Sequence, residues 1–281
     1  MEYMQANNDT SVGPLWHARY RESAADSGHV ASNEVVRHLL NHRSVRAYLP
    51  DAVPESVLAA AIAAAQSAST SSNLQAWSVI AITDRARKAR LAALAGNQRH
   101  IETAPLYLAW VLDLSRLRRA GESQRQPTDG LDYLETFVVG AVDTALAAQN
   151  AAAAFESFGL GLVYIGGMRN HPEAVARELA LPAQSVVLFG MCVGFPDPDH
   201  LPAVKPRLPQ AAVLHREQYN ASAEHESIDA YDKRVSEYLQ ERGGNAGSWR
   251  EAAVARIGSA GALSGRDRLR EALSALAFKL L

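Results

Sequence analysis

Residues 162–193 read LVYIGGMRNHPEAVARELALPAQSVVLFGMCV and alternate between strand and helix patterns. Short apolar runs at residues 162–165 and 186–193 predict two strands. Between them, Pro172 suits the first turn of a helix that we expect to end near Leu179. Such alternation is typical of domains in which helices cover a central sheet, so this stretch favours an α+β fold with α/β-like units.

The other elements are predicted from the spacing of apolar residues. We expect helices at about residues 35–40, 54–65, 84–96 and 136–158, and strands at residues 77–82 and 106–112. Ser32 and Asn33 are both candidate caps for the first of these helices. Residues 115–130 are charged and have no clear period, which predicts a mobile excursion over the surface. The C-terminal part is predicted to be helical, with a break at Gly258.

The 281 residues carry a formal net charge of −2, and 48 % of them are hydrophobic. This composition can bury a substantial core, and it gives no bulk attraction to nucleic acids or to anionic membranes, so we expect neither as a partner. The sequence predicts one globular domain over residues 35–281. Residues 1–34 form an N-terminal extension that reads as a loose lead-in without a signal-peptide pattern.

The apolar residues 136–158 raise the question of a membrane span. Asp143, Gln149, Asn150 and Glu156 interrupt them, which favours a buried helix. The single cysteine, Cys192, lies in another apolar run and is expected to be a small buried side chain. These features predict a cytoplasmic protein.

Two short cationic segments fall where predicted elements end, and backbone donors at such ends are available to a ligand. They are His42-Arg43-Ser44-Val45-Arg46 and Lys205-Pro206-Arg207. Arginine offers forked donors to a phosphate, and a proline between two cations stiffens the chain that presents them. Each segment by itself is also compatible with an ordinary solvated loop.

Three further segments carry groups that suit a flat ring with several carbonyls and ring nitrogens. Residues 69–77 are dense in small donors and amides, and Gln98 follows a helix end at Gly96. Gly166 and Gly167 follow a predicted strand, where a backbone without side chains can approach such a ring. The alternatives are a solvated loop for residues 69–77 and a simple strand-to-helix turn for the glycine pair.

Several other kinds of site are excluded by missing patterns. No Gly-x-Gly-x-x-Gly fingerprint occurs, so we expect no Rossmann dinucleotide site. No His-Glu-x-x-His spacing occurs and one cysteine cannot build a zinc cluster, so no metal site is predicted. A serine hydrolase is poorly supported, because the sequence has no Gly-x-Ser-x-Gly elbow.

In their order along the chain, these segments resemble the FMN-dependent nitroreductase superfamily, and most closely its NADPH-dependent, oxygen-insensitive nitroreductase and flavin reductase group. The resemblance covers about residues 35–249. It is carried by HRSVR at residues 42–46, the serine cluster ending in LQ at 74–75, QRH at 98–100, YIGGMR at 164–169 and KPRLP at 205–209. It implies a nitroreductase-type FMN-binding fold, with a central mixed sheet flanked by helices, in an intertwined homodimer.

The resemblance also implies a role for each motif in an FMN site shared by two protomers. The phosphate and ribityl end would be held by His42, Arg43, Ser44, Lys205 and Arg207. The edge of the isoalloxazine ring would be reached by Arg46 and Gln98, and its face would lie against Tyr164, Ile165, Gly166 and Gly167. The second protomer would contribute Thr70, Ser71, Ser72 and Gln75. Arg242 would bind the extra phosphate of NADPH.

The implied reaction is a ping-pong transfer of hydride from NADPH, or from NADH, through the flavin N5 to a nitroaromatic, quinone or flavin acceptor. No side chain is expected to act as a catalytic acid or base, because positioning and stacking carry most of the rate. Asn73 stands where the group usually has a bulky aromatic, and Gly247 stands near the position of a second phosphate-binding arginine. The alternatives are a flavin-binding carrier or sensor without turnover, and a superfamily enzyme with a dedicated substrate.

Overall fold

The computed structural model describes residues 12–23 and 30–281. Contacts within the chain divide it into two compact units. The helical unit comprises the described residues up to Arg43 together with Ala203–Ala262, and the sheet unit comprises Ser44–Pro202 and Leu263–Leu281. The sequence predicts a boundary between an extension and one domain after residue 34, and this boundary stays a prediction. The contacts divide the chain after Arg43 instead, and they group its N-terminal part with Ala203–Ala262.

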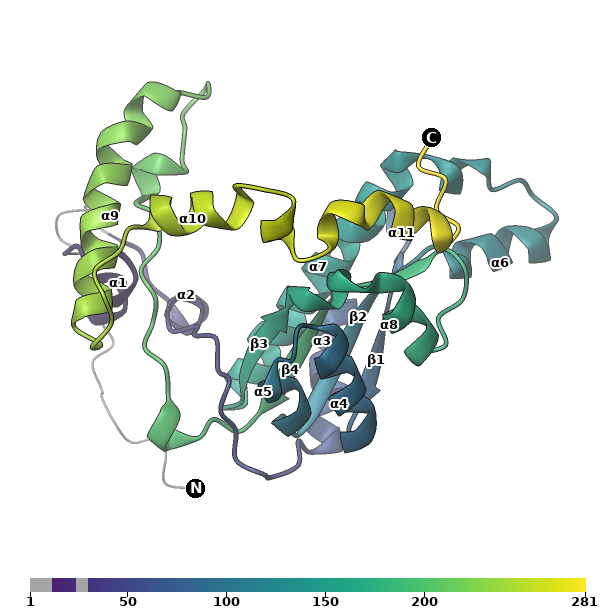
Figure 1. The fold of residues 1–281 in the computed structure, drawn as a ribbon, viewed down its shortest axis with the longest axis horizontal. Coiled ribbons are helices and arrows are strands. Elements are labelled where there is room, and N and C mark those ends of the chain that lie inside the picture. The colour runs from purple at the N-terminus through teal and green to yellow at the C-terminus, as the bar shows by residue number, and fades with distance from the viewer. Residues whose placement is uncertain (1–11, 24–29) are drawn as a thin grey trace. The chain divides into compact units, whose positions relative to one another are not determined.

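The sheet unit is built on four strands that all pair antiparallel, in the order β1-β2-β4-β3 (Figure 1). They are β1 (Trp77–Ile82), β2 (Leu106–Asp113), β3 (Gly161–Ile165) and β4 (Ser185–Gly194). All four predicted strands are confirmed. The strand and helix alternation of residues 162–193 does not produce parallel neighbours, because β3 and β4 run antiparallel. Ser44, which belongs to no strand, forms an isolated parallel bridge with Leu162 of β3.

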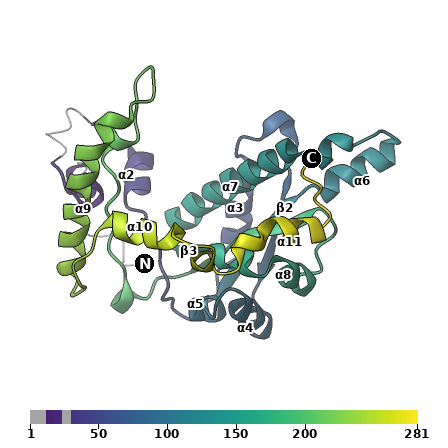
Figure 2. The same ribbon diagram turned by 45° about the horizontal axis from the view of Figure 1, so that its top comes forward.

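Helices cover both faces of this sheet. They are α3 (Glu55–Gln66), α4 (Arg85–Leu94), α5 (Arg99–Thr103), α6 (Ser115–Gln124), α7 (Leu134–Ser157), α8 (Pro172–Glu178) and α11 (Leu269–Ala275). Tyr107 and Ala109 of β2 face the core formed with α4, α5 and α8, whereas Leu108 and Trp110 face the core formed with α3 and α7. Figure 2 shows these two groups of helices on opposite sides of the sheet. The alternation of side chains along β2 therefore ties both layers together.

Helix α7 is, among the described residues, the one helix long and apolar enough to cross a membrane by length and composition. Within this chain it is a core helix, because Ala147, Ala151 and Phe155 are fully buried against α3 and the sheet. Its Asp143 is also buried and binds a neighbouring loop. The predicted buried helix is confirmed. The expected burial of Cys192 is also confirmed, and burial raises the pKa of its thiol.

The helical unit contains α1 (Gly13–Tyr20), α2 (Glu34–Leu40), α9 (Glu224–Gln240) and α10 (Trp249–Ile257). Asn33 caps α2, since its side chain accepts a hydrogen bond from the Val36 N–H at 2.9 Å. Ser248 and Glu251 form a capping box at the start of α10, which ends at Gly258 as the sequence predicts.

Two sequence predictions are wrong. The predicted excursion over residues 115–130 begins with α6, whose first turn is held by the Asp113 carboxylate accepting hydrogen bonds from Ser115 and Arg116. The charged surface of α6 hides its period. The loose lead-in is wrong for Gly13–Tyr20, which form α1 with a buried Trp16. The rest of that prediction, residues 1–11 and 24–29, lies outside the described residues.

Candidate functional site

The first cationic segment starts where α2 ends. The Asn41 N–H still donates to the Arg37 carbonyl at 3.1 Å, and the chain then leaves the helix. Arg43 folds back on Asn41, donating to its carbonyl at 3.3 Å and to its side-chain oxygen. The chain passes between the two units after Arg43, so His42 and Arg43 belong to the helical unit, and Ser44 and Arg46 to the sheet unit.

The second cationic segment is held by its backbone. Lys205 and Arg207 are exposed, and Pro206 between them is buried. Tyr231 of α9 donates its hydroxyl to the Pro206 carbonyl at 3.1 Å, and the Arg207 N–H donates to the Arg19 carbonyl at 2.8 Å. Because the backbone is fixed, only the two side chains would have to be ordered for both cations to reach one anion.

Arg19 of α1 brings the two cationic segments together within the helical unit. Its guanidinium donates to the carbonyls of Leu40 and His42, each at 2.8 Å, and to the carbonyl of Lys205 at 3.0 Å. The side chain is buried, with 6 % of the residue exposed. Sequence reasoning missed Arg19, because it lies in the predicted lead-in, and no local pattern reveals a contact 186 residues away along the chain.

The serine cluster of the sheet unit is held by Asp143, which projects from α7. Its carboxylate accepts hydrogen bonds from the Thr70 hydroxyl at 2.6 Å, the Ser71 N–H at 3.2 Å and the Ala76 N–H at 3.2 Å. Asp143 is 2 % exposed. Sequence reasoning noted this residue only as an interruption of an apolar helix. A buried acid in such a helix is itself a signal that polar partners lie nearby.

The backbone of the serine cluster is tightly folded. Ser72, Asn73 and Gln75 all adopt the left-handed region, with φ of 49°, 55° and 49°. Non-glycine residues rarely do so, and the strain is sustained only by surrounding contacts. The Gln75 N–H also donates to the Thr70 hydroxyl at 3.0 Å, so Thr70 is engaged inside the loop while the side chains of Ser71, Ser72 and Gln75 are exposed.

The glycine pair and Gln98 meet in the sheet unit. Gln98 donates its amide to the Ala95 carbonyl at 2.8 Å. A Cβ added to Gly167 would lie 2.6 Å from that carbonyl oxygen and 2.7 Å from the Gln98 amide nitrogen. Only glycine therefore allows this close approach. Gly166 has more space, and its nearest neighbours are the guanidinium groups of Arg169 and Arg266.

Arg169 and Arg266 are further cations near the glycine pair that the predicted site does not include. Burial is the main cause that lowers the pKa of Arg169, and the Arg266 charge adds to it. Arg169 donates to the Leu188 carbonyl, and Arg266 donates to the Asn170 side chain at 3.0 Å. Arg169 lies inside the YIGGMR motif, so the sequence could have indicated it as a site residue. No motif contains Arg266, so the sequence gives no such indication for it.

The remaining predicted ring-contact residues differ in how they are buried. Ile165 is 1 % exposed, with its side chain in the core, so only its backbone is left for a ligand. Tyr164 packs edge-on against Phe189, and burial raises the pKa of its phenol. Arg46 is exposed, and its charge, after burial, is the second cause that lowers the pKa of His100.

Arg242, the predicted NADPH-phosphate residue, lies just after α9 in the helical unit. It is exposed, and its guanidinium carbon stands 5.1 Å from the centre of the Tyr238 ring. The guanidinium of Arg21 lies 5.7 Å from the same ring and is paired with Glu241. Arg242 and a second arginine thus approach the same ring, but Arg21 comes from the N-terminal extension and not from the position of Gly247.

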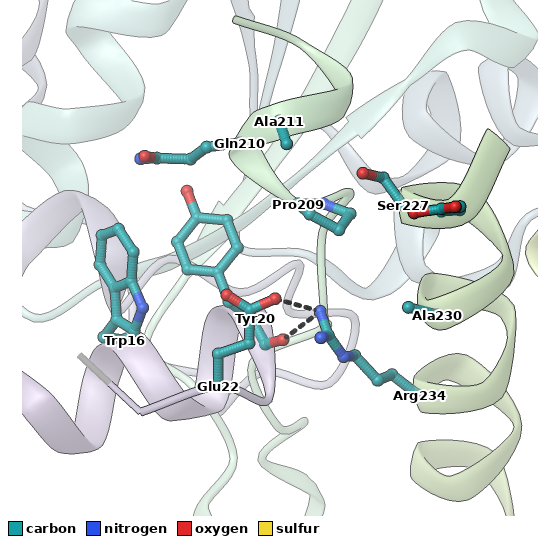
Figure 3. Close-up of a pocket in the computed structure, with 10 residues that line it drawn as sticks. Trp16, Tyr20, Glu22, Pro209, Gln210, Ala211, Ser227, Ala230 and Arg234 are labelled. Carbon is teal, nitrogen blue, oxygen red and sulfur yellow. Dashed lines mark hydrogen bonds and ion pairs between the residues drawn. The ribbon is translucent and has the colours of Figure 1, made fainter. Parts of the chain in front are cut away.

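A separate cavity of about 480 Å³ lies in the helical unit between α1 and α9 (Figure 3). Trp16 and Tyr20 line it from α1, and Arg234 lines it from α9. No predicted site residue lines this cavity. Among the described residues, no group of three or more His, Cys, Asp or Glu side chains gathers in a way that could hold a metal ion.

An antiparallel sheet covered on both faces by helices defines an α+β domain. The model of the Nitroreductase family matches residues 39–195, and that of the Nitroreductase family C-terminal domain matches residues 205–281. The chain belongs to the nitroreductase family, as the resemblance of its motifs predicts.

Individual relatives agree with this assignment. The FMN reductase (NADPH) of Bacillus subtilis (strain 168) is 38 % identical over 213 residues, which are 75 % of this chain and 85 % of the relative. The oxygen-insensitive NADPH nitroreductase of Salmonella typhimurium is 42 % identical over 207 residues, 74 % of this chain and 83 % of the relative. The solved structure of B. megaterium NfrA2 has a TM-score of 0.84 at 37 % identity, covering 89 % of this chain and 100 % of its own. The predicted α+β nitroreductase-type fold is confirmed, and the four described strands pair antiparallel where the resemblance implies a mixed sheet.

Proposed function

We propose that this chain is an FMN-dependent oxidoreductase that transfers hydride from NADPH, or less efficiently from NADH, to small electron-poor acceptors such as nitroaromatics, quinones or flavins. The observation that carries the proposal is the pair of cationic segments held by one buried arginine, since a flavin mononucleotide brings a phosphate of about two negative charges. The names of the relatives, FMN reductase (NADPH) and NADPH nitroreductase, support the same cofactor pair.

The donor groups present fit this cofactor. In the helical unit, Arg43, Lys205 and Arg207 supply charge for the phosphate. In the sheet unit, the Gly167 turn lies directly against the Gln98 amide, and such an edge suits a flat ring with carbonyls and ring nitrogens. Bound FMN supplies the redox chemistry, and the residues of this chain bind and orient it. We assign no side chain the role of catalytic acid or base.

The decisive experiment is anaerobic reduction of the purified protein with its bound flavin. We expect NADPH to bleach the flavin absorbance, and a nitroaromatic or a quinone to restore it. A protein that retains FMN but is not bleached by either nicotinamide would be a carrier or sensor, which contradicts turnover. A protein that stays colourless after FMN is added would contradict the cofactor itself.

We propose a homodimer as the functional state. Leu134, Val138, Val142 and Leu146 are spaced four residues apart on α7 and are 42 to 51 % exposed, which is unusual for a contiguous apolar stripe. The serine cluster is attached to the same helix through Asp143, so its exposed residues would reach a second copy that docks on α7. Val142→Glu should shift the protein towards monomer in sedimentation velocity, and an unchanged dimer would contradict this interface.

Arg242 is proposed to select NADPH over NADH through the extra phosphate. The exposed guanidinium beside Tyr238 offers a forked donor to that group. Arg242→Ala should lower kcat/KM with NADPH by about tenfold and leave kcat/KM with NADH within about twofold, because one exposed charge-assisted contact is worth roughly 1.4 kcal/mol. Equal losses with both cofactors would remove this role. A cytoplasmic location stays a prediction from the sequence.

A further inference from the structure

We propose that helix α1 of the N-terminal extension braces the phosphate end of the flavin site, with Arg19 as the positioning residue. The proposal rests on the proposed FMN function. Residues matched by the family model begin at residue 39, so α1 lies before the matched region. Arg19 therefore lies outside the residues that the family model matches.

The contacts of Arg19 define the brace. Its guanidinium donates to three carbonyls, those of Leu40 at the end of α2, of His42 and of Lys205. The Arg19 carbonyl accepts a hydrogen bond from the Arg207 N–H. One buried residue thus makes three hydrogen bonds to the backbones of the two cationic segments and a fourth to Leu40 at the end of α2. Hydrogen bonds that involve a buried charge are among the stronger ones in proteins.

The direction of these carbonyls matters for a ligand. In a planar trans peptide the C=O and the following N–H point in opposite directions. Because the His42 carbonyl points towards Arg19, the Arg43 N–H is directed away from it. The guanidinium therefore turns this peptide so that its donor faces away from the brace, as an anion-binding backbone requires. Arg19 also adds positive charge behind Arg43 and Lys205.

Helix α1 is itself fixed to α9. Arg234 of α9 donates to the Tyr20 carbonyl at 3.3 Å and pairs with Glu22, as the dashed lines in Figure 3 show. Trp16 is buried and packs on Tyr20 with ring centres 4.5 Å apart. These anchors hold the helix at the end where Arg19 emerges, so the guanidinium is presented from a rigid element.

The test compares two flavins that differ only at the phosphate. Full-length protein freed of flavin is titrated with FMN and with riboflavin, and binding is followed by flavin fluorescence. We expect Arg19→Ala to raise the Kd for FMN about ten- to hundredfold and to leave the Kd for riboflavin within about twofold. An unchanged Kd for FMN would overturn the proposal. Equal losses for both flavins would also overturn it, because they would show a general effect on the fold.

Two further variants keep the result interpretable. Arg19→Lys keeps the charge but not the fork, so we expect an intermediate loss of FMN affinity; full affinity would show that charge alone suffices and would contradict the brace. His17→Ala changes an exposed residue of the same helix and should bind both flavins as the wild type does. A wild-type protein that binds no FMN would refute the proposed function, whereas FMN binding that is indifferent to Arg19 would refute only this inference.

Discussion

The serine cluster and the two cationic segments are each held by one buried charged side chain, but the charges have opposite signs. Asp143 accepts two backbone N–H groups and one hydroxyl at the serine cluster. Arg19 donates to the carbonyls of His42 and Lys205 in the cationic segments and to that of Leu40 at the end of α2. The sign follows from which backbone groups point inward, since inward N–H groups need an acceptor and inward carbonyls need a donor.

The comparison also concerns what each loop presents outward. Around Asp143 the inward N–H groups are satisfied, and small hydroxyl and amide side chains are exposed. Around Arg19 the inward carbonyls are satisfied, and cations are exposed at Lys205 and Arg207. The buried negative charge of Asp143 thus holds a loop that exposes neutral polar side chains. The buried positive charge of Arg19 holds segments that expose cations, which suit an anion. The two braces differ in origin, because Asp143 lies inside the region matched by the family model and Arg19 lies outside it.

The largest effect on stability is expected for Asp143→Ala. The substitution leaves the Thr70 hydroxyl and the N–H groups of Ser71 and Ala76 without their acceptor, in a loop that already contains left-handed residues. We expect the free energy of unfolding to fall by about 3 kcal/mol, measured by urea denaturation at one fixed protein concentration. Asp143→Asn keeps one carbonyl acceptor and should lose less. Wild-type stability of Asp143→Ala would mean that the loop needs no brace.

Gly167→Ala tests a close backbone contact in a loop that does not depend on a buried charge. The added Cβ would lie 2.6 Å from the Ala95 carbonyl oxygen, and backbone cannot easily move there. We expect a loss of about 2 kcal/mol in the free energy of unfolding and weaker FMN binding through the displaced Gln98. The matched control is Gly130→Ala, because a Cβ at Gly130 would meet nothing within 4 Å. If both variants were equally stable, the close approach at Gly167 would not be a constraint.

Sequence patterns predicted the elements of the sheet unit well, because β2 is a continuous run of buried residues and the buried alanines of α7 recur at helical spacing up to Phe155. The pairing of β3 with β4 did not follow from their alternation with a helix, since strand direction depends on the path of the connection. Helix α6 has a charged surface and therefore no apolar period. The motifs predicted which loops form the proposed FMN site. Asp143 and Arg19 hold these loops through contacts with residues far away in the sequence, and local spacing contains no information on such contacts.

Tyr231→Phe tests whether the cationic segments depend on one brace or two. The variant removes the hydroxyl that donates to the Pro206 carbonyl, and Arg19 holds the neighbouring residues. We expect FMN affinity to fall about fivefold, as one buried neutral hydrogen bond is worth roughly 1 kcal/mol. In combination with Arg19→Ala the losses should be non-additive, because both residues hold the same segment. Tyr219→Phe, an exposed tyrosine of the same unit, is the control and should bind FMN normally. Strict additivity would show that the two contacts act independently.

The smallest effect is expected for Arg46, an exposed cation that influences the pKa of His100 through its charge and makes, among the described residues, no buried hydrogen bonds to a loop backbone. Burial lowers the pKa of His100, and the charge of Arg46 lowers it further. Arg46→Gln should therefore raise the pKa of His100 in the flavin-free protein, but the pKa should stay below the ordinary value of 6.5, because the larger cause, burial, remains. An NMR titration of the histidine ring protons measures this. Added salt should raise the pKa in the wild type and have little effect in the variant, since salt screens the arginine but does not alter burial. A pKa that is the same in both proteins would mean that the charge of Arg46 does not influence His100.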